Sequence, residues 1–160
     1  MAVSKTKTNA MRLLDSMKAN YSMLSYEVTD GKVDGISVAE KIGKPMETVF
    51  KTLVTQGTSK NYYVFVIPVE AELDLKKAAK AAGEKKVEMV AVKEIQKLTG
   101  YIRGGCSPIG MKKLYPTFID INAEQLEKMI VSGGKIGCQI ELSPNVLKEL
   151  LTAKMVQLTD

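Results

Sequence analysis

The sequence predicts an α+β domain in which antiparallel strand pairs are interspersed with short helices. Two β-rich apolar segments, 49–56 and 62–68, flank the turn-forming stretch 57–61, and this pattern is typical of a β-hairpin. Helix signals lie between groups of strands and do not follow each strand in turn, which disfavours a βαβ series. A chain of 160 residues can bury one sizeable core, so we expect residues 1–160 to form a single domain.

The segment before the hairpin begins with a helix signal. Thr8 can cap a helix that runs to about Lys18, because apolar residues recur there at helical spacing. The capping-box spacing of Ser37 and Glu40 predicts a second helix, which ends near Gly43. The other elements predicted in this segment are a strand over 22–28 and a helical turn that begins at Pro45.

Short helices and short strands are also predicted after the hairpin. Asp74 caps a helix over 75–82 that ends at Gly83, and apolar spacing predicts another helix over 92–98 that ends at Gly100. The remaining predicted elements are strands at 87–89, 117–121, 128–131 and 136–142, a short helix at 123–127, a last helix from Ser143 to about Leu151, and an edge strand at 155–158.

Histidine is absent from the chain, and this narrows the chemistry available to it. Without an imidazole, Ser-His-Asp and Cys-His catalysis are excluded. The only cysteines, Cys106 and Cys138, have no metal-ligand spacing, so we expect no metal and no cofactor. Reduced thiols, no secretory h-region and no apolar run of membrane-spanning length together predict a cytoplasmic protein without membrane contact.

Positive charge is concentrated in the middle of the chain. The formal net charge is +5, and the segment from Lys76 to Lys113 alone holds ten basic and three acidic residues. Such a segment fits a phosphate-rich partner, and it also fits an ordinary solvated lysine surface. Charge alone does not separate these two interpretations.

The glycine-rich stretch 104–113 reads GGCSPIGMKK and is the most distinctive part of the sequence. Its glycines and Pro108 permit a turn in which several backbone N–H groups converge on an anion or a polarised carbonyl. A tight connection without a ligand is the alternative interpretation. Lys51, inside the first strand of the hairpin, either occupies an exposed strand position or points into a polar pocket.

Five segments, taken together and in this order, form a recognisable set: KTNAMRLL (7–14), VFKTL (49–53), LDLKKAAK (73–80), GGCSPIGMKK (104–113) and VSGGK (131–135). They resemble the YbaK/EbsC family of free-standing aminoacyl-tRNA deacylases, which is related to the editing domain of bacterial prolyl-tRNA synthetases. The resemblance spans nearly the whole chain. It implies a strongly curved, barrel-like mixed β-sheet surrounded by helices, with a pocket for the terminal adenosine and its aminoacyl ester.

The resemblance also implies which residues form the site. Lys51 is implied to be catalytic, and it either holds the ribose or terminal phosphate or raises the thiolate fraction of a cysteinyl substrate. Tyr26 is either a pocket wall or a core residue, and Ser107 either binds substrate or shapes the turn before Pro108. The full expected set is Lys51, Gly104 and Gly105 for catalysis, Tyr26, Ser107, Pro108, Ser132, Gly133 and Gln139 for substrate binding, and Lys76, Lys77, Lys80, Lys112 and Lys113 for tRNA phosphates.

The expected reaction is trans-editing, in which mischarged Cys-tRNA(Pro) is deacylated by its own thiol while backbone N–H groups of residues 104–106 stabilise the oxyanion. The chain departs from the family where Gln139 replaces a common aspartate, and Asp34 and Ile36 occupy a loop that often holds a phenylalanine. These departures bear on amino-acid selectivity. An Ala-tRNA(Pro) deacylase and a non-catalytic module that binds tRNA ends or a synthetase are the alternatives. The expected partner is the 3′ end of aminoacylated tRNA, with prolyl-tRNA synthetase as the candidate for a transient complex.

Overall fold

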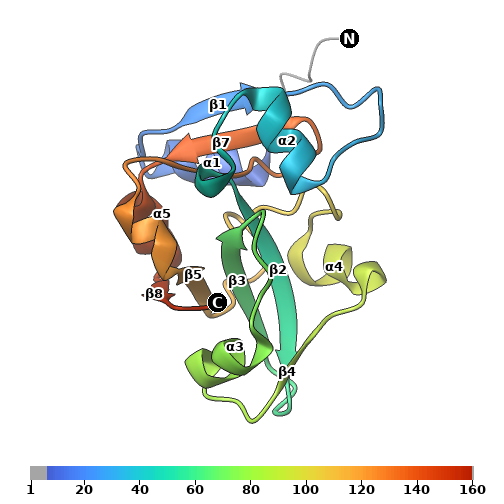
Figure 1. Ribbon diagram of the computed structural model, residues 1–160, viewed down its shortest axis with the longest axis vertical. Coiled ribbons are helices and arrows are strands. Elements are labelled where there is room, and N and C mark those ends of the chain that lie inside the picture. The colour runs from blue at the N-terminus through green and yellow to red at the C-terminus, as the bar shows by residue number, and fades with distance from the viewer. Residues whose placement is uncertain (1–6, 160) are drawn as a thin grey trace.

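The protein folds into two open β-sheets with helices packed around them (Figure 1). The structure is a computed structural model that describes residues 7–159. The smaller sheet has the strand order β1–β7–β6, and the larger has the order β4–β2–β3–β5–β8. The strands are β1 (Ser22–Ser25), β2 (Phe50–Gly57), β3 (Tyr62–Pro68), β4 (Val87–Met89), β5 (Thr117–Asp120), β6 (Met129–Ser132), β7 (Cys138–Leu142) and β8 (Lys154–Val156).

The helices begin and end largely where the sequence signals predict. Thr8 accepts the N–H of Met11 at the start of the first helix, and Asp74 caps the third. Gly43, Gly83 and Gly100 end their helices in the left-handed conformation. In the described part of the chain the helices are α1 (Asn9–Ser16), α2 (Gly35–Ile42), α3 (Leu75–Ala82), α4 (Val92–Thr99) and α5 (Pro144–Leu151), with short 3₁₀ turns η1 (Met46–Thr48) and η2 (Ile121–Gln125).

The two sheets meet at the start of β2. Val49 forms a parallel bridge with Ile130, and the remaining pairings stay within one sheet or the other. The larger sheet is mixed, because β2–β3 is antiparallel while β3–β5 and β5–β8 are parallel. The mixed α+β architecture is therefore confirmed, whereas the barrel-like closure is not confirmed, since neither sheet closes on itself.

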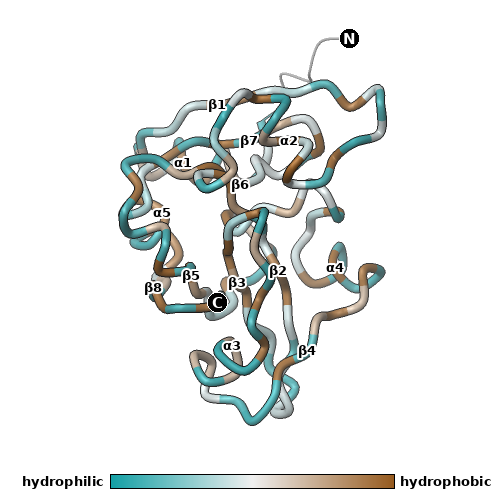
Figure 2. Tube along the Cα trace, in the orientation of Figure 1, coloured by the Kyte–Doolittle hydropathy of each residue, from teal (hydrophilic) through white to brown (hydrophobic). Residues whose placement is uncertain are grey.

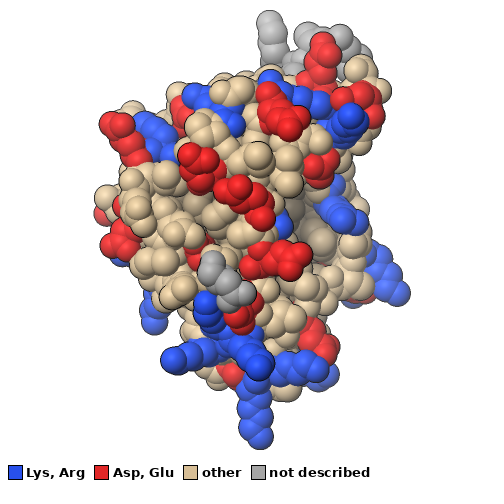
Figure 3. All heavy atoms as spheres, viewed as in Figure 1, with Lys and Arg blue, Asp and Glu red and all other residues tan. Residues whose placement is uncertain are grey.

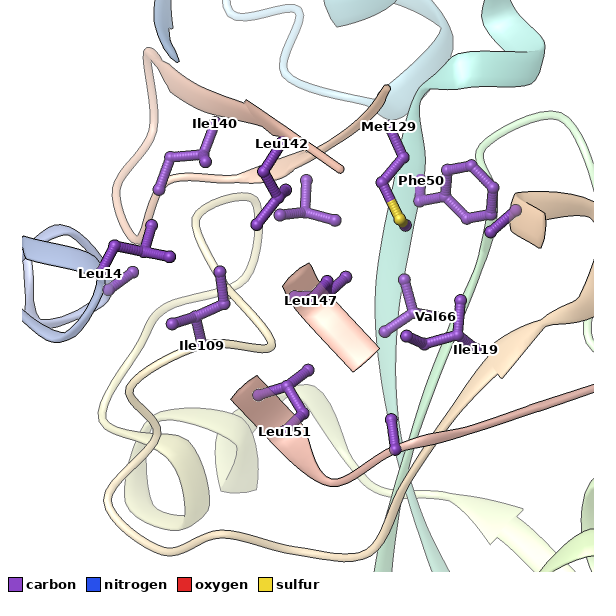
Figure 4. Packing of buried hydrophobic residues seen from close by; sticks show 14 of the residues in the cluster. Leu14, Phe50, Val66, Ile109, Ile119, Met129, Ile140, Leu142, Leu147 and Leu151 are labelled. Atoms are coloured by element: carbon purple, nitrogen blue, oxygen red, sulfur yellow. The ribbon is translucent and has the colours of Figure 1, made fainter. Parts of the chain in front are cut away.

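The main hydrophobic core lies where both sheets face α1 and α5 (Figure 4). Leu14 from α1, Leu147 from α5 and Ile140 from β7 are fully buried in it. Burying one such side chain contributes roughly 2 kcal/mol before the entropy of ordering it is counted. A second cluster packs α3 against the opposite face of the larger sheet. There the rings of Phe65 and Phe118 stack with their centroids 5.4 Å apart. Figure 2 accordingly shows hydrophobic residues along β3 and hydrophilic residues along the outer connections.

Several predicted boundaries differ from the observed ones. The helix predicted at 123–127 is the 3₁₀ turn η2, and the strands predicted at 136–142 and 155–158 are Cys138–Leu142 and Lys154–Val156. Two further boundaries differ for reasons that are visible in the local hydrogen bonds. The second helix begins at Gly35 because Asp34, and not Ser37, is its N-cap: the Asp34 carboxylate accepts both the N–H and the hydroxyl of Ser37. The predicted strand 22–28 ends at Ser25, because the chain turns at Val28, whose carbonyl accepts the N–H of Gly31. No helix in residues 7–159 is long and apolar enough to span a bilayer.

Candidate functional site

Strand register brings Lys51, Ser132 and Gln139 to one face of the joined sheets. Val49 and Ile130 are bridged in parallel, so Lys51 and Ser132 lie two residues further along adjacent strands and on the same side. Ser132 is in turn paired with Gln139 on β7. Val49 packs in a cluster with Ala39 of α2, so this is the face that α2 partly covers. Lys51 is half-buried there, and Gln139 is buried.

Tyr26 extends this row at the end of β1. Leu24 pairs with Gln139, and the Tyr26 N–H donates to the carbonyl oxygen of Gly137, 3.0 Å away. Its ring is buried, and among the described residues its hydroxyl has no hydrogen-bond partner. The Lys41 ammonium lies 5.8 Å from the ring centroid. Tyr26 is thus part of the core by burial, and its hydroxyl oxygen is a buried polar atom without a partner among the described residues.

The glycine-rich loop packs against the turn between β6 and β7. A Cβ added to Gly105 would lie 2.9 Å from backbone atoms of Lys135 and Ile136, so only glycine fits there. A Cβ on Gly104 would lie 3.5 Å from both Ile136 and Val33, and its φ is +86°. The loop therefore adjoins both the β6–β7 turn and the connection between β1 and α2.

The backbone of this loop already uses one of its predicted donors. The N–H of Gly105 donates to the carbonyl oxygen of Ile102 at 3.0 Å. An oxyanion site built from this loop would therefore use the N–H groups of Gly104 and Cys106. That narrows the expected set of three backbone donors to two.

The β6–β7 turn is held in place from two sides. Ser132 Oγ accepts the N–H of Gly134 at 3.2 Å, and the Gly133 carbonyl accepts the hydroxyl of Thr8 at 2.5 Å. Gly133 also packs so closely that a Cβ would lie 2.6 Å from Cys138 Sγ. The turn that presents Ser132 is consequently fixed to the start of α1.

Ser107 and Pro108 lie outside the paired strand positions that form this row. Ser107 is fully buried, and its hydroxyl accepts the N–H of Ile109, so its role in the structure is to shape the turn. Pro108 lines a hollow of about 240 Å³ between α1 and α5, together with Lys113. The structure does not bring either residue beside Lys51, and their binding of substrate stays a prediction.

The predicted tRNA-binding lysines are spread over several elements. Lys76, Lys77 and Lys80 are on α3, at the end of the long axis opposite α2 (Figure 1), and the Lys77 ammonium donates to the Thr159 carbonyl. Lys112 packs its aliphatic chain near Gly100, and Lys113 lies 5.9 Å from the Tyr115 ring centroid. Figure 3 shows basic side chains gathered over the α3 end of the molecule.

The molecular surface is hollowed beside the upper part of β2, below α2, where basic side chains lie at the edge (Figure 3). A separate hollow of about 540 Å³ lies between the tip of the β2–β3 hairpin, β4 and α4. None of the predicted site residues lines this 540 Å³ hollow. The candidate site is therefore defined by strand register and loop packing on the α2 side, and not by the larger hollow.

Neither cysteine is poised for nucleophilic attack. Burial raises the pKa of Cys106 to about 11, and it also raises the pKa of Cys138. Both side chains are therefore neutral thiols near pH 7.

Two residues beside the site, Val33 and Lys41, were not predicted from the sequence, because a valine in a loop and a lysine in a helix carry no distinguishing pattern.

Comparison with known proteins supports the resemblance on independent grounds. Residues 33–150 match the family model of the aminoacyl-tRNA editing domain. The chain is 47% identical to an Enterococcus faecalis protein named "Putative Cys-tRNA(Pro)/Cys-tRNA(Cys) deacylase EbsC", over 99% of this chain and 98% of the relative. It is 25% identical to the uncharacterized protein YwhH of Bacillus subtilis, over 89% of this chain and 93% of that protein.

Solved structures share the fold at lower sequence identity. "Crystal structure of a putative trans-editing enzyme for prolyl tRNA synthetase" matches with a TM-score of 0.83 and 21% identity, over 99% of both chains. Hypothetical protein APE2540 matches with a TM-score of 0.87 and 21% identity, over 96% of this chain and 100% of that one. The family match covers most of the sequence, and the 47% identical relative covers nearly all of it. The chain therefore belongs to the aminoacyl-tRNA editing domain family.

Proposed function

We propose that this protein is a trans-editing hydrolase that deacylates mischarged tRNA, with Cys-tRNA(Pro) as its substrate. The observation that carries the proposal is the 47% identity, end to end, to a relative named for deacylation of Cys-tRNA(Pro) and Cys-tRNA(Cys). Membership of the editing-domain family supports the reaction class, which is hydrolysis of the ester between an amino acid and tRNA.

Lys51 is assigned the cationic role in this reaction. Among the described residues its ammonium has neither a hydrogen bond nor an ion pair, so none of these residues competes with a ligand for it. It shares a face with Ser132 and Gln139, whose hydroxyl and amide can hydrogen-bond the substrate's ribose or amino group. A phosphate or ribose anchor and a stabiliser of the substrate thiolate are both consistent with this placement.

The substrate supplies the nucleophile in the proposed mechanism. The cysteinyl sulfur attacks the ester carbonyl carbon, the carbon–oxygen bond to the ribose breaks, the ribose oxygen takes up a proton, and the amino acid leaves as a thiolactone. The N–H groups of Gly104 and Cys106 would stabilise the oxyanion, and one such donor contributes on the order of 3 kcal/mol to the transition state. The raised pKa values of both protein thiols support this division of roles.

A panel of Cys-, Ser-, Ala- and Pro-charged tRNA(Pro) tests the proposal by measuring ester loss over time. We expect fastest release from Cys-tRNA(Pro), and slower release from the serine ester, because it differs only in lacking the thiol. Lys51→Ala should abolish release while the fold is retained. Lys128→Ala is the matched control, because Lys128 is an exposed lysine just before β6. Equal release by wild type and Lys51→Ala would contradict the proposed site, and faster release of alanine would select the Ala-tRNA(Pro) alternative.

A non-catalytic module is the second candidate, and the replacement of an acid by Gln139 favours it. The amide of Gln139 is buried beside Ser132 and Leu24, where it can accept a hydrogen bond but supplies no negative charge to hold the substrate's ammonium. This candidate predicts binding of tRNA ends or of a synthetase with no ester loss from any charged tRNA in the panel.

A further inference from the structure

We infer that Lys41 is a positioning residue that fastens the connection between β1 and α2, residues 27–34, against the candidate site and thereby sets which aminoacyl groups enter. We refer to residues 27–34 as the strap. The inference rests on the proposed function, since it assigns a determinant of selectivity to the same site. Figure 1 shows the strap standing out from α2 on the side where the chain after α4 approaches it.

The Lys41 ammonium uses its full set of donors on the strap. It donates to the carbonyl oxygens of Glu27 and Lys32 at 2.7 and 2.8 Å, and to Asp30 Oδ1 at 2.7 Å. An ammonium group has three N–H donors, so all of them are engaged. The Lys41 side chain is only 19% exposed, which distinguishes it from an ordinary surface lysine, whose ion pairs contribute little.

Val28 and Val33 of the strap approach Gly137 and Gly104, but among the described residues the strap makes few other hydrogen bonds. Within it, Asp30 Oδ1 also accepts the N–H of Lys32, and the N–H of Gly31 donates to Val28. Both of these contacts are local turns that do not tie the strap to the rest of the fold. Its far end is fixed by Asp34, the N-cap of α2. Lys41 is therefore the contact that joins the beginning and the end of the strap to the last turn of α2.

The strap borders the candidate site at Val33, and Lys41, which fastens it, borders the site at Tyr26. A Cβ added to Gly104 would lie 3.5 Å from the Val33 side chain. The Lys41 ammonium lies over the Tyr26 ring. Gly104 carries one of the two N–H groups assigned to the oxyanion. Releasing the strap would let Val33 move away from Gly104, which would widen the space for the aminoacyl group and admit water.

Lys41→Met tests the inference, because it removes all three hydrogen bonds and keeps the aliphatic chain. We expect the amides of residues 27–34 to exchange with solvent at least tenfold faster, in line with the loss of charge-assisted hydrogen bonds. The ratio of the cysteine release rate to the alanine release rate should fall by about tenfold, while tRNA affinity is unchanged. Lys41→Arg should recover part of the ratio, since a guanidinium can reach the same oxygens.

The matched control is Lys44→Met, two residues beyond the end of the same helix. Lys44 pairs with Glu141 on β7 and not with the strap, so this variant should leave strap exchange and the release ratio unchanged. Asp30→Asn keeps a neutral acceptor in place and should give an intermediate effect, and it provides a second test should Lys41→Met fold poorly.

Two results would overturn the inference. Unchanged amide exchange across residues 27–34 in Lys41→Met would show that Lys41 does not fasten the strap. Faster exchange with an unchanged release ratio would show that the strap does not set selectivity. If wild-type protein released no amino acid from any charged tRNA, the proposed function would fail, and the exchange measurement would still decide whether Lys41 holds the strap.

Discussion

A cysteine inside the glycine-rich loop is the residue that most invites a nucleophile interpretation, and its surroundings argue against it. Cys106 is half-buried in the loop, and its sulfur lies 3.9 Å from the hydroxyl oxygen of Thr99. Desolvation penalises the thiolate more than this weak hydrogen bond favours it, so the pKa rises to about 11. At pH 7 the thiolate is then a minute fraction of the population, and the side chain acts as a small apolar residue.

We therefore predict that Cys106→Ser retains deacylation of Cys-tRNA(Pro) within a few-fold of wild type. The pH dependence of the rate gives a second measure. If the substrate thiol attacks, the rate should rise through the ordinary thiol range near ~8.5 and not toward 11. Loss of activity in Cys106→Ser with a native circular dichroism spectrum would instead assign the nucleophile to the protein.

Single residues also show where sequence reasoning stopped. Thr8, Asp74 and Gly83 were predictable as caps, because capping depends on side chains within three or four residues. Asp34 displaced Ser37 as the cap of α2 because two plausible caps lay three residues apart, and only the structure shows which one accepts the hydrogen bonds. Lys41 was not predictable, since its partners are 9 to 14 residues away in a loop.

At the scale of elements, the packing of the glycine-rich loop on the β6–β7 turn holds the two halves of the site together. We predict that Gly105→Ala destabilises the protein by about 3 kcal/mol, at the upper end of the usual cost of overpacking, and lowers deacylation. Its Cβ would overlap backbone atoms of Lys135 and Ile136, which cannot move aside as a flexible side chain can. Gly83→Ala is the control: its φ is +73°, and nothing lies within 4 Å of an added Cβ, so it should cost only about 1 kcal/mol. Urea unfolding measures both, and equal losses would contradict the packing argument.

The tip of the β2–β3 hairpin depends on a carboxylate from outside it. Glu84 accepts hydrogen bonds from Tyr63, Thr58 and Ser59, with Ser59 contributing both its N–H and its hydroxyl. These bonds, with that of the Ser59 hydroxyl foremost, lower the Glu84 pKa from 4.5 to about 2. Folding therefore favours the ionised Glu84 carboxylate, and its hydrogen bonds contribute fully to stability above pH 4.5.

We predict that Glu84→Gln lowers the free energy of unfolding at pH 7 and makes it depend less on pH in the acidic range. Because the folded pKa is depressed, the wild-type contribution is lost as pH falls from 4.5 toward 2. The difference in urea midpoint between wild type and variant should therefore shrink across that window. A difference that stays constant from pH 7 to pH 2 would show that Glu84 ionisation does not support the hairpin.

The elements themselves were largely predictable, but their assembly was not. The hairpin, α3 and α5 follow from alternation, caps and Pro144 at the first helical position. The junction of the two sheets rests on a single bridge between residues 81 apart, Val49 and Ile130, and no local pattern encodes it. Barrel-like closure was expected from the resemblance alone, and the open sheets show that the strand pattern does not require it.

At the scale of the whole molecule, charge is unevenly distributed along the long axis, because acidic side chains mix with basic ones near α2 and basic ones predominate over α3 (Figure 3). A tRNA whose 3′ end enters the candidate site would be favoured with its phosphates toward the α3 end of the molecule. Backbone contacts of this kind give affinity without reading sequence.

We predict that the double variant Lys76→Ala, Lys80→Ala weakens tRNA binding and leaves the rate at saturating substrate unchanged. Both lysines are exposed on α3, so removing them affects encounter with phosphates and not the site beside β2. The slope of log affinity against log salt concentration should fall by about 1 to 2, since each lost phosphate contact removes roughly 0.7 to 0.9. Lys128→Ala, Lys148→Ala is the control with the same change of charge, at exposed positions outside the predicted tRNA-binding set. A slope that falls equally in both variants would mean that overall charge, and not the α3 surface, attracts the tRNA.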